Sequence, residues 1–154
     1  MSDPVATENT NGGVRFIGLF SIIIGAIMIV AGGVTWFVIT DQLSAQNITV
    51  SEDATNFGGQ KVQGPFTAYA QAQIIDKHAL EATGGKTYAE LEQDDPLRPV
   101  AMNASFLRAS LFTSVVAFGV AALVVGLGII FILVGWALRK IGTALAYDTA
   151  TGTR

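Results

Sequence analysis

Few side chains in this sequence are of the kinds that do chemistry, and their spacing does not build a catalytic site. His78 is the only histidine, and there are no cysteines. Iron, zinc and copper sites draw on several His, Cys or carboxylate ligands. His78 with Asp76 and Glu81 on one short helix is too small a ligand set, so we interpret His78 as a polar residue on a solvated or interfacial strip. We expect no metal and no cofactor.

The remaining polar clusters also favour structural roles. The acidic run 90–95 lacks the alternating ligand spacing of a calcium loop, which indicates a solvated turn. Ser110, Thr113 and Ser114 have no histidine and carboxylate partners, and such hydroxyls bond to a helix carbonyl or to a neighbouring helix. There is no glycine-rich phosphate loop and no pair of buried carboxylates. The sequence therefore predicts that the protein is not an enzyme.

The composition indicates a membrane protein. Hydrophobic residues make up 51% of the 154, charged residues only 14%, and the mean hydropathy is +0.50. The net charge is −3 and the basic residues are scattered. Because no basic cluster could follow a phosphate backbone, we expect no nucleic-acid partner.

Two uncharged apolar runs, 16–40 and 110–138, are long enough to be transmembrane helices. At about 1.5 Å per residue, the first covers roughly 37 Å against a hydrocarbon core of about 30 Å. Neither run has the polar face that a soluble helix of this length would need. Carriers and pumps place ionisable groups inside the membrane, and these runs have none.

The placement of charge predicts that both termini are cytoplasmic, in the plasma membrane. Arg15 precedes the first run, and Arg139 and Lys140 follow the second, whereas the connecting loop holds four basic and nine acidic residues. Trp36, Trp136 and Arg108 are placed to anchor the spans at the interfaces. The predicted order is cytoplasmic tail, span, extracytoplasmic loop, span with an outer extension, and cytoplasmic tail, over residues 1–13, 14–40, 41–105, 106–138 and 139–154.

We expect the loop to form a small, mainly helical cap, so that the fold class is an all-α membrane hairpin with a loop domain. A short strand is predicted within 46–54, a helix over 66–82, and a brief helix from Thr87, where Glu90 completes a capping box. Small and apolar residues share one face of the longer helix, and polar residues form a narrow strip. The face is Ala68, Ala72, Ile75, Ala79 and Ala82, and the strip is Thr67, Gln71, His78 and Glu81. With few large apolar residues, the cap needs another surface to pack on.

Small side chains recur every seven residues in both spans and predict a helix-packing face on each, since they let membrane helices approach closely. These positions, with those between them, are Gly18, Ser21, Gly25, Gly32 and Thr35, and Ser114, Ala117, Ala121, Gly128 and Gly135. A second set is a candidate face for a partner. It consists of Gly119 and Gly126 in the second span and of Phe66, Tyr69, Ala72 and Ile75 in the loop helix.

Four stretches carry a family resemblance: ITVSEDA, GPFTAYAQAQII, GGKTYAEL and SFLRASLFTSVVAFG. They resemble a family of small two-span actinobacterial membrane proteins, often called aromatic ring-opening dioxygenases, over roughly residues 14–140. That name implies an iron site, which one histidine and no cysteine do not supply. Small proteins of this kind resemble accessory subunits of large membrane assemblies, notably the respiratory cytochrome bcc–aa3 supercomplex.

The leading hypothesis is therefore a non-catalytic accessory or scaffolding subunit of a larger plasma-membrane complex. Its partners would be other integral membrane proteins, with cytochrome oxidase or bcc subunits implied by the resemblance, together with the lipid bilayer. One alternative is a self-associating membrane protein with Gly119 and Gly126 in its contact. Another is an extracytoplasmic ligand-binding module lined by the helix over 66–82.

Overall fold

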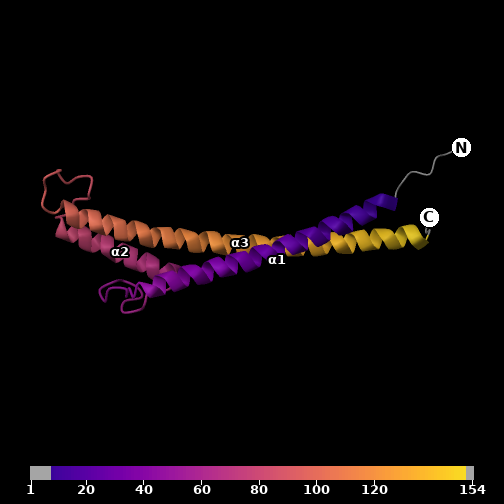
Figure 1. The fold of residues 1–154 in the computed structure, drawn as a ribbon, viewed down its shortest axis with the longest axis horizontal. Helices are drawn as coiled ribbons and strands as arrows, with labels where there is room; N and C mark the ends of the chain where they lie inside the picture. The colour runs from indigo at the N-terminus through magenta and orange to yellow at the C-terminus, as the bar shows by residue number, and fades with distance from the viewer. Residues whose placement is uncertain (1–7, 152–154) are drawn as a thin grey trace. The chain divides into compact units, whose positions relative to one another are not determined.

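The part of the chain that the structure describes contains three helices. The computed structural model describes residues 8–151, with side-chain surroundings for residues 12–144. The helices are α1 (Glu8–Ala45), α2 (Pro65–Ala82) and α3 (Arg98–Thr151) (Figure 1). The described residues contain no strand, so the predicted all-helical class is confirmed. The outermost parts of the two predicted tails, 1–7 and 152–154, lie outside the described residues.

Both long helices extend beyond the apolar runs. α1 has 38 residues and α3 has 54, because helix propagation adds one backbone hydrogen bond per residue and does not require apolar side chains. Within them, the stretches 12–45 and 98–144 have the length and composition to cross a membrane. Only 22% and 17% of the residues in their most apolar windows are buried, whereas the core helix of a soluble protein is mostly buried.

The chain divides into two compact units. The helix-pair unit consists of α1 up to Gly33 and of α3 from Ala122 onward. The cap unit, Val34–Ala121, contains the end of α1, all of α2, the first part of α3 and the segments that connect them.

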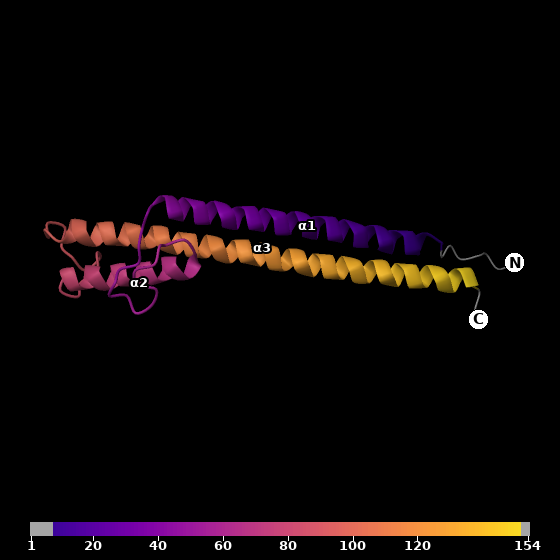
Figure 2. The ribbon, with the colours of Figure 1, turned by 90° about the horizontal axis from the view of Figure 1, so that it is seen from below.

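The cap unit has its own hydrophobic core. Within it, α2 lies alongside the first part of α3 (Figures 1 and 2). The core joins α1, the loop after it, α2 and α3, through Leu43, Val50, Val62, Ala68, Ala72, Leu111 and Phe118. Ala68 and Ala72 of the apolar face of α2 are thus buried by this chain, whereas Ala82 is exposed, so the long helices provide part of the surface that the cap was predicted to need.

The loop between α1 and α2 holds its two buried valines through a small backbone pairing. Thr49 and Lys61 form an isolated antiparallel bridge, and the N–H of Val50 donates to the carbonyl of Gln60 at 2.8 Å. Val50 and Val62 are each 1% exposed. The strand predicted within 46–54 is wrong, since a single bridge is too short to make one.

The predicted helix over 66–82 is confirmed as α2, but its polar strip is only partly right. Gln71 is 9% exposed, and its Oε1 accepts a hydrogen bond from the N–H of Ser51 at 3.0 Å. Gln71, which was predicted to lie on the polar strip, is buried because the loop before α2 folds over this side chain. Ala72, proposed for a partner face, is fully buried in the core and is therefore not available to a partner.

The brief helix predicted from Thr87 is a turn. Its capping contact does form, because the N–H and the hydroxyl of Thr87 both donate to Oε2 of Glu90 at 2.7 Å. These hydrogen bonds lower the pKa of the Glu90 carboxyl below its usual value. Arg98 then donates to the carbonyl of Leu91 at 2.6 Å. That bond satisfies an acceptor which a continued helix would have used.

Candidate functional site

Two pairs of glycines bring the backbones of α1 and α3 into contact in the helix-pair unit. A Cβ atom added at Gly25 would lie 2.5 Å from the carbonyl oxygen of Gly128, and one at Gly128 would lie 2.6 Å from that of Gly25. Gly18 and Gly135 oppose each other in the same way, at 2.7 and 2.5 Å. Real Cβ contacts essentially never fall under 3.0 Å, so only glycine fits at these four positions.

The other residues of the predicted helix-packing faces are distributed over both units. Oγ of Ser21 donates to the carbonyl of Phe131 at 2.7 Å, which joins α1 to α3 by a side-chain hydrogen bond. Gly32 and Ala121 are buried, and Ala117 is half-buried. Oγ of Ser114 donates to the carbonyl of Ser110 in its own helix at 3.2 Å, as predicted for hydroxyls in this cluster.

Gly119 and Gly126 lie on a different side of α3. Nothing lies within 4 Å of a Cβ atom added at either position. At about 100° per residue, Gly126 is turned roughly 200° from Gly128, so Gly126 faces away from the contact with α1 in the helix-pair unit. Each of these two glycines therefore leaves open space beside α3, Gly119 in the cap unit and Gly126 in the helix-pair unit.

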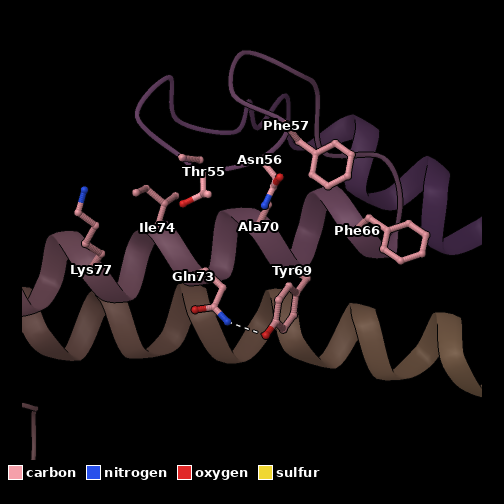
Figure 3. Close-up of a pocket in the computed structure, with 10 residues that line it drawn as sticks. Thr55, Asn56, Phe57, Phe66, Tyr69, Ala70, Gln73, Ile74 and Lys77 are labelled. Atoms are coloured by element: carbon pink, nitrogen blue, oxygen red, sulfur yellow. Dashed lines mark hydrogen bonds between the residues drawn. The ribbon is translucent and has the colours of Figure 1, made fainter.

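An aromatic groove of about 450 Å³ lies between α2 and the loop before it (Figure 3). Phe57, Phe66 and Tyr69 line it with exposures of 41%, 73% and 47%. Nε2 of Gln73 donates to the hydroxyl of Tyr69 at 2.6 Å. Phe57 has a φ of 62°, an uncommon conformation for a bulky residue, which indicates that the loop constrains its placement. The groove suits an apolar ligand or side chain. The sequence analysis did not identify Phe57, although the following Gly58-Gly59 marked the turn.

The single histidine belongs to a small ion-pair cluster outside the apolar runs. Nε2 of His78 lies 2.7 Å from Oδ2 of Asp53, and Nζ of Lys77 lies 3.6 Å from the same oxygen. The hydrogen bond with His78 lowers the pKa of the Asp53 carboxyl below its usual value. The structure therefore brings His78 to Asp53, rather than to Asp76 or Glu81, and no sequence signal marked this contact. Residues 12–144 contain no group of three or more His, Cys, Asp or Glu residues placed to hold a metal ion.

Arg108, which was predicted to anchor its span at the membrane interface, connects α3 to α2. Its Nη1 donates to Oδ1 of Asp76 at 2.8 Å, and its guanidinium carbon lies 5.5 Å from the ring centroid of Phe112. Tyr69, one α2 residue lining the aromatic groove, packs its ring edge-on against Phe112 at 5.8 Å. These two contacts fix α2 antiparallel to α3.

The tryptophans at the predicted interfaces each have an aromatic or cationic neighbour. In the cap unit, the Trp36 ring lies 4.7 Å from that of Phe118. In the helix-pair unit, Nζ of Lys140 lies 3.9 Å from the ring centroid of Trp136, a distance that allows a cation–π interaction. Arg139 is exposed, with its stem beside Gly18.

The arrangement offers close helix contacts and apolar surfaces, and its described residues bring together no nucleophile, base and orienting group. We find no match to this chain among protein-family models, curated proteins or solved structures. Its function must therefore be argued from its own residues.

Proposed function

We propose that the protein spans the plasma membrane twice, with both termini in the cytoplasm and residues 41–105 outside. The length and low burial of the two apolar stretches support this placement. Arg15, Arg139 and Lys140 flank their cytoplasmic ends, and Asp53, Asp76 and Glu81 lie in the cap unit.

A reporter that is active only outside the cytoplasm tests this topology. We expect activity when the reporter is inserted at Gly84, which has open space around it in the turn after α2. The same reporter should be silent when it follows Arg154. The reverse pattern would show that the loop is cytoplasmic.

Within that topology, we infer that the protein is a non-catalytic accessory subunit of a larger membrane complex. The observation that carries this inference is the open space at Gly119 and at Gly126, where nothing lies within 4 Å of an added Cβ atom. Lipid chains are as apolar as leucine, so membrane helices associate through close packing, which small residues permit. The family resemblance makes the respiratory bcc–aa3 oxidase supercomplex the host that we propose.

Co-migration in a mild detergent tests the accessory role. The wild-type chain should run with a much larger assembly that contains other membrane proteins, including oxidase subunits if the proposed host is right. Gly126→Leu should release a large part of the chain from that assembly, because the added side chain fills the open space at this position. Val120→Leu should not, since Val120 is exposed on another side of the helix.

A chain that runs only as a monomer would contradict the accessory role, even in nanodiscs drawn directly from the membrane. A homodimer that Gly126→Leu disrupts would instead favour the self-association hypothesis. The aromatic groove favours a second candidate function, an extracytoplasmic binding module, because it offers a concave apolar surface with a few polar groups on α2.

A further inference from the structure

One exposed face of α2 changes from aromatic to charged along the helix. Four side chains make up this face, spaced by three or four residues and therefore on one side of the helix: Phe66, Tyr69, Gln73 and Lys77. All four are exposed, and all four line the aromatic groove. Figure 3 shows Phe66 at one end of this row and Lys77 at the other. The row thus passes from an apolar ring, through a phenol and an amide, to an ammonium group.

The hydroxyl of Tyr69 is directed toward the polar end of this row. It accepts a hydrogen bond from Nε2 of Gln73, one turn closer to Lys77, at 2.6 Å (Figure 3). The ring of Tyr69 packs edge-on against Phe112 of α3. Tyrosine adopts this arrangement, with an apolar ring and a hydroxyl turned to polar groups, where a membrane meets water.

The uncharged parts of α2 and α3 lie side by side. α2 has no charged side chain before Asp76, and α3 has none between Arg108 and Arg139. Asp76 pairs with Arg108 at 2.8 Å, so this ion pair bounds the uncharged stretch of both helices at the same level. Because α2 is antiparallel to α3, Phe66 lies on the uncharged side of the pair, about one turn beyond the contact between Tyr69 and Phe112.

We propose that residues 65–75 of α2 lie in the outer surface of the lipid bilayer, with Phe66 among the acyl chains, Tyr69 among the headgroups and Lys77 in water. This inference rests on the proposed topology, which places the outer ends of both spans in the cap unit. The charged residue nearest to Phe66 in the chain is Lys61, which is exposed. An ammonium group on a flexible stem suits the phosphates of lipid headgroups.

The order of polarity favours the bilayer over a protein partner. At about 1.5 Å per residue, Phe66 and Lys77 are roughly 16 Å apart along the helix axis, and one headgroup region is about 5–8 Å thick. The row is therefore long enough to cross that region from hydrocarbon to water. A bilayer imposes this change of surroundings, and it would cover the aromatic face that the described part of the chain leaves exposed.

Spin labels on the full chain test this placement. Single cysteines are simple to introduce, because the sequence contains none. In lipid nanodiscs, electron paramagnetic resonance compares collisions of each label with molecular oxygen, which dissolves among acyl chains, and with a water-soluble nickel complex. A label on Phe66→Cys should collide more with oxygen, and one on Lys77→Cys more with nickel. Both native side chains are exposed, so these replacements should preserve the fold.

Val116→Cys supplies the reference, since Val116 is exposed inside the uncharged run of α3. Its label should favour oxygen if α3 spans the membrane. A Phe66 label that favours nickel beside a Val116 label that favours oxygen would overturn this inference alone. A Phe66 label shielded from both reagents would also overturn it, because protein would then cover the face. A Val116 label that favours nickel would overturn the proposed topology as well.

Discussion

Leucine in place of Gly25 or Gly128 should separate α1 from α3 and abolish most of the folded yield. Even a Cβ atom at Gly25 would meet the carbonyl oxygen of Gly128 at 2.5 Å, and backbone cannot move aside as a flexible side chain can. Overpacking a well-packed contact costs about 1–3 kcal/mol. Leucine adds three more carbons at a position where one does not fit, so we expect the upper end of that range or more.

Thermal unfolding in detergent, followed by circular dichroism, measures this effect. Ile23→Leu and Ile130→Leu provide controls, because both side chains are about half exposed and lie off the glycine contact. A second control is Gly119→Ala, which has open space for the added carbon and should preserve or slightly raise stability, since alanine is the better helix former. Equal losses at Gly25 and Ile23 would contradict the glycine contact.

Phe118→Ala should destabilise the cap unit strongly. Phe118 is 1% exposed, and its ring lies edge-on to Trp36. Removing a buried phenylalanine side chain leaves a cavity and costs about 3–5 kcal/mol in soluble proteins. Since Phe118 belongs to the proposed span, where apolar transfer contributes less, we expect about 3 kcal/mol.

The matched control is Phe106→Ala on the same helix, where the ring is 66% exposed and its loss should change stability little. Fluorescence of Trp36 in a Trp136→Phe background reports on the affected region directly. A Phe118→Ala protein that melts with the wild type and keeps the same Trp36 spectrum would contradict the assigned core.

The helices could be predicted from the sequence because their signals are local. The uncharged runs identify α1 and α3, and Gly64-Pro65 marks the beginning of α2. Their full extent could not be predicted, since residues beyond the apolar runs remain helical without a periodic signal. At Thr87–Glu90 the opposite holds: the sequence signal for a helix is present and its capping contact forms, but no helix follows.

The sites were harder to predict because they depend on segments distant in sequence. The seven-residue spacing indicated faces on each span, but the pairing of Gly25 with Gly128 requires the register between two helices. The helical period placed Gln71 on the polar strip of α2. The loop segment around Ser51, which buries Gln71, gives no sign of that contact in its sequence. The Asp53–His78 contact is non-local in the same way.

The contact between α1 and α3 also has a consequence for biosynthesis. Ser21 and its acceptor Phe131 are 110 residues apart. At about 5–20 residues per second, α3 would be synthesised on the order of ten seconds after α1. In the proposed membrane topology, α1 would have to persist in the bilayer as an independent helix during that interval, with Gly18 and Gly25 facing lipid. Membrane insertion and helix pairing would therefore be separate steps, and the nascent chain would be open to a wrong helix partner until its own second span arrived.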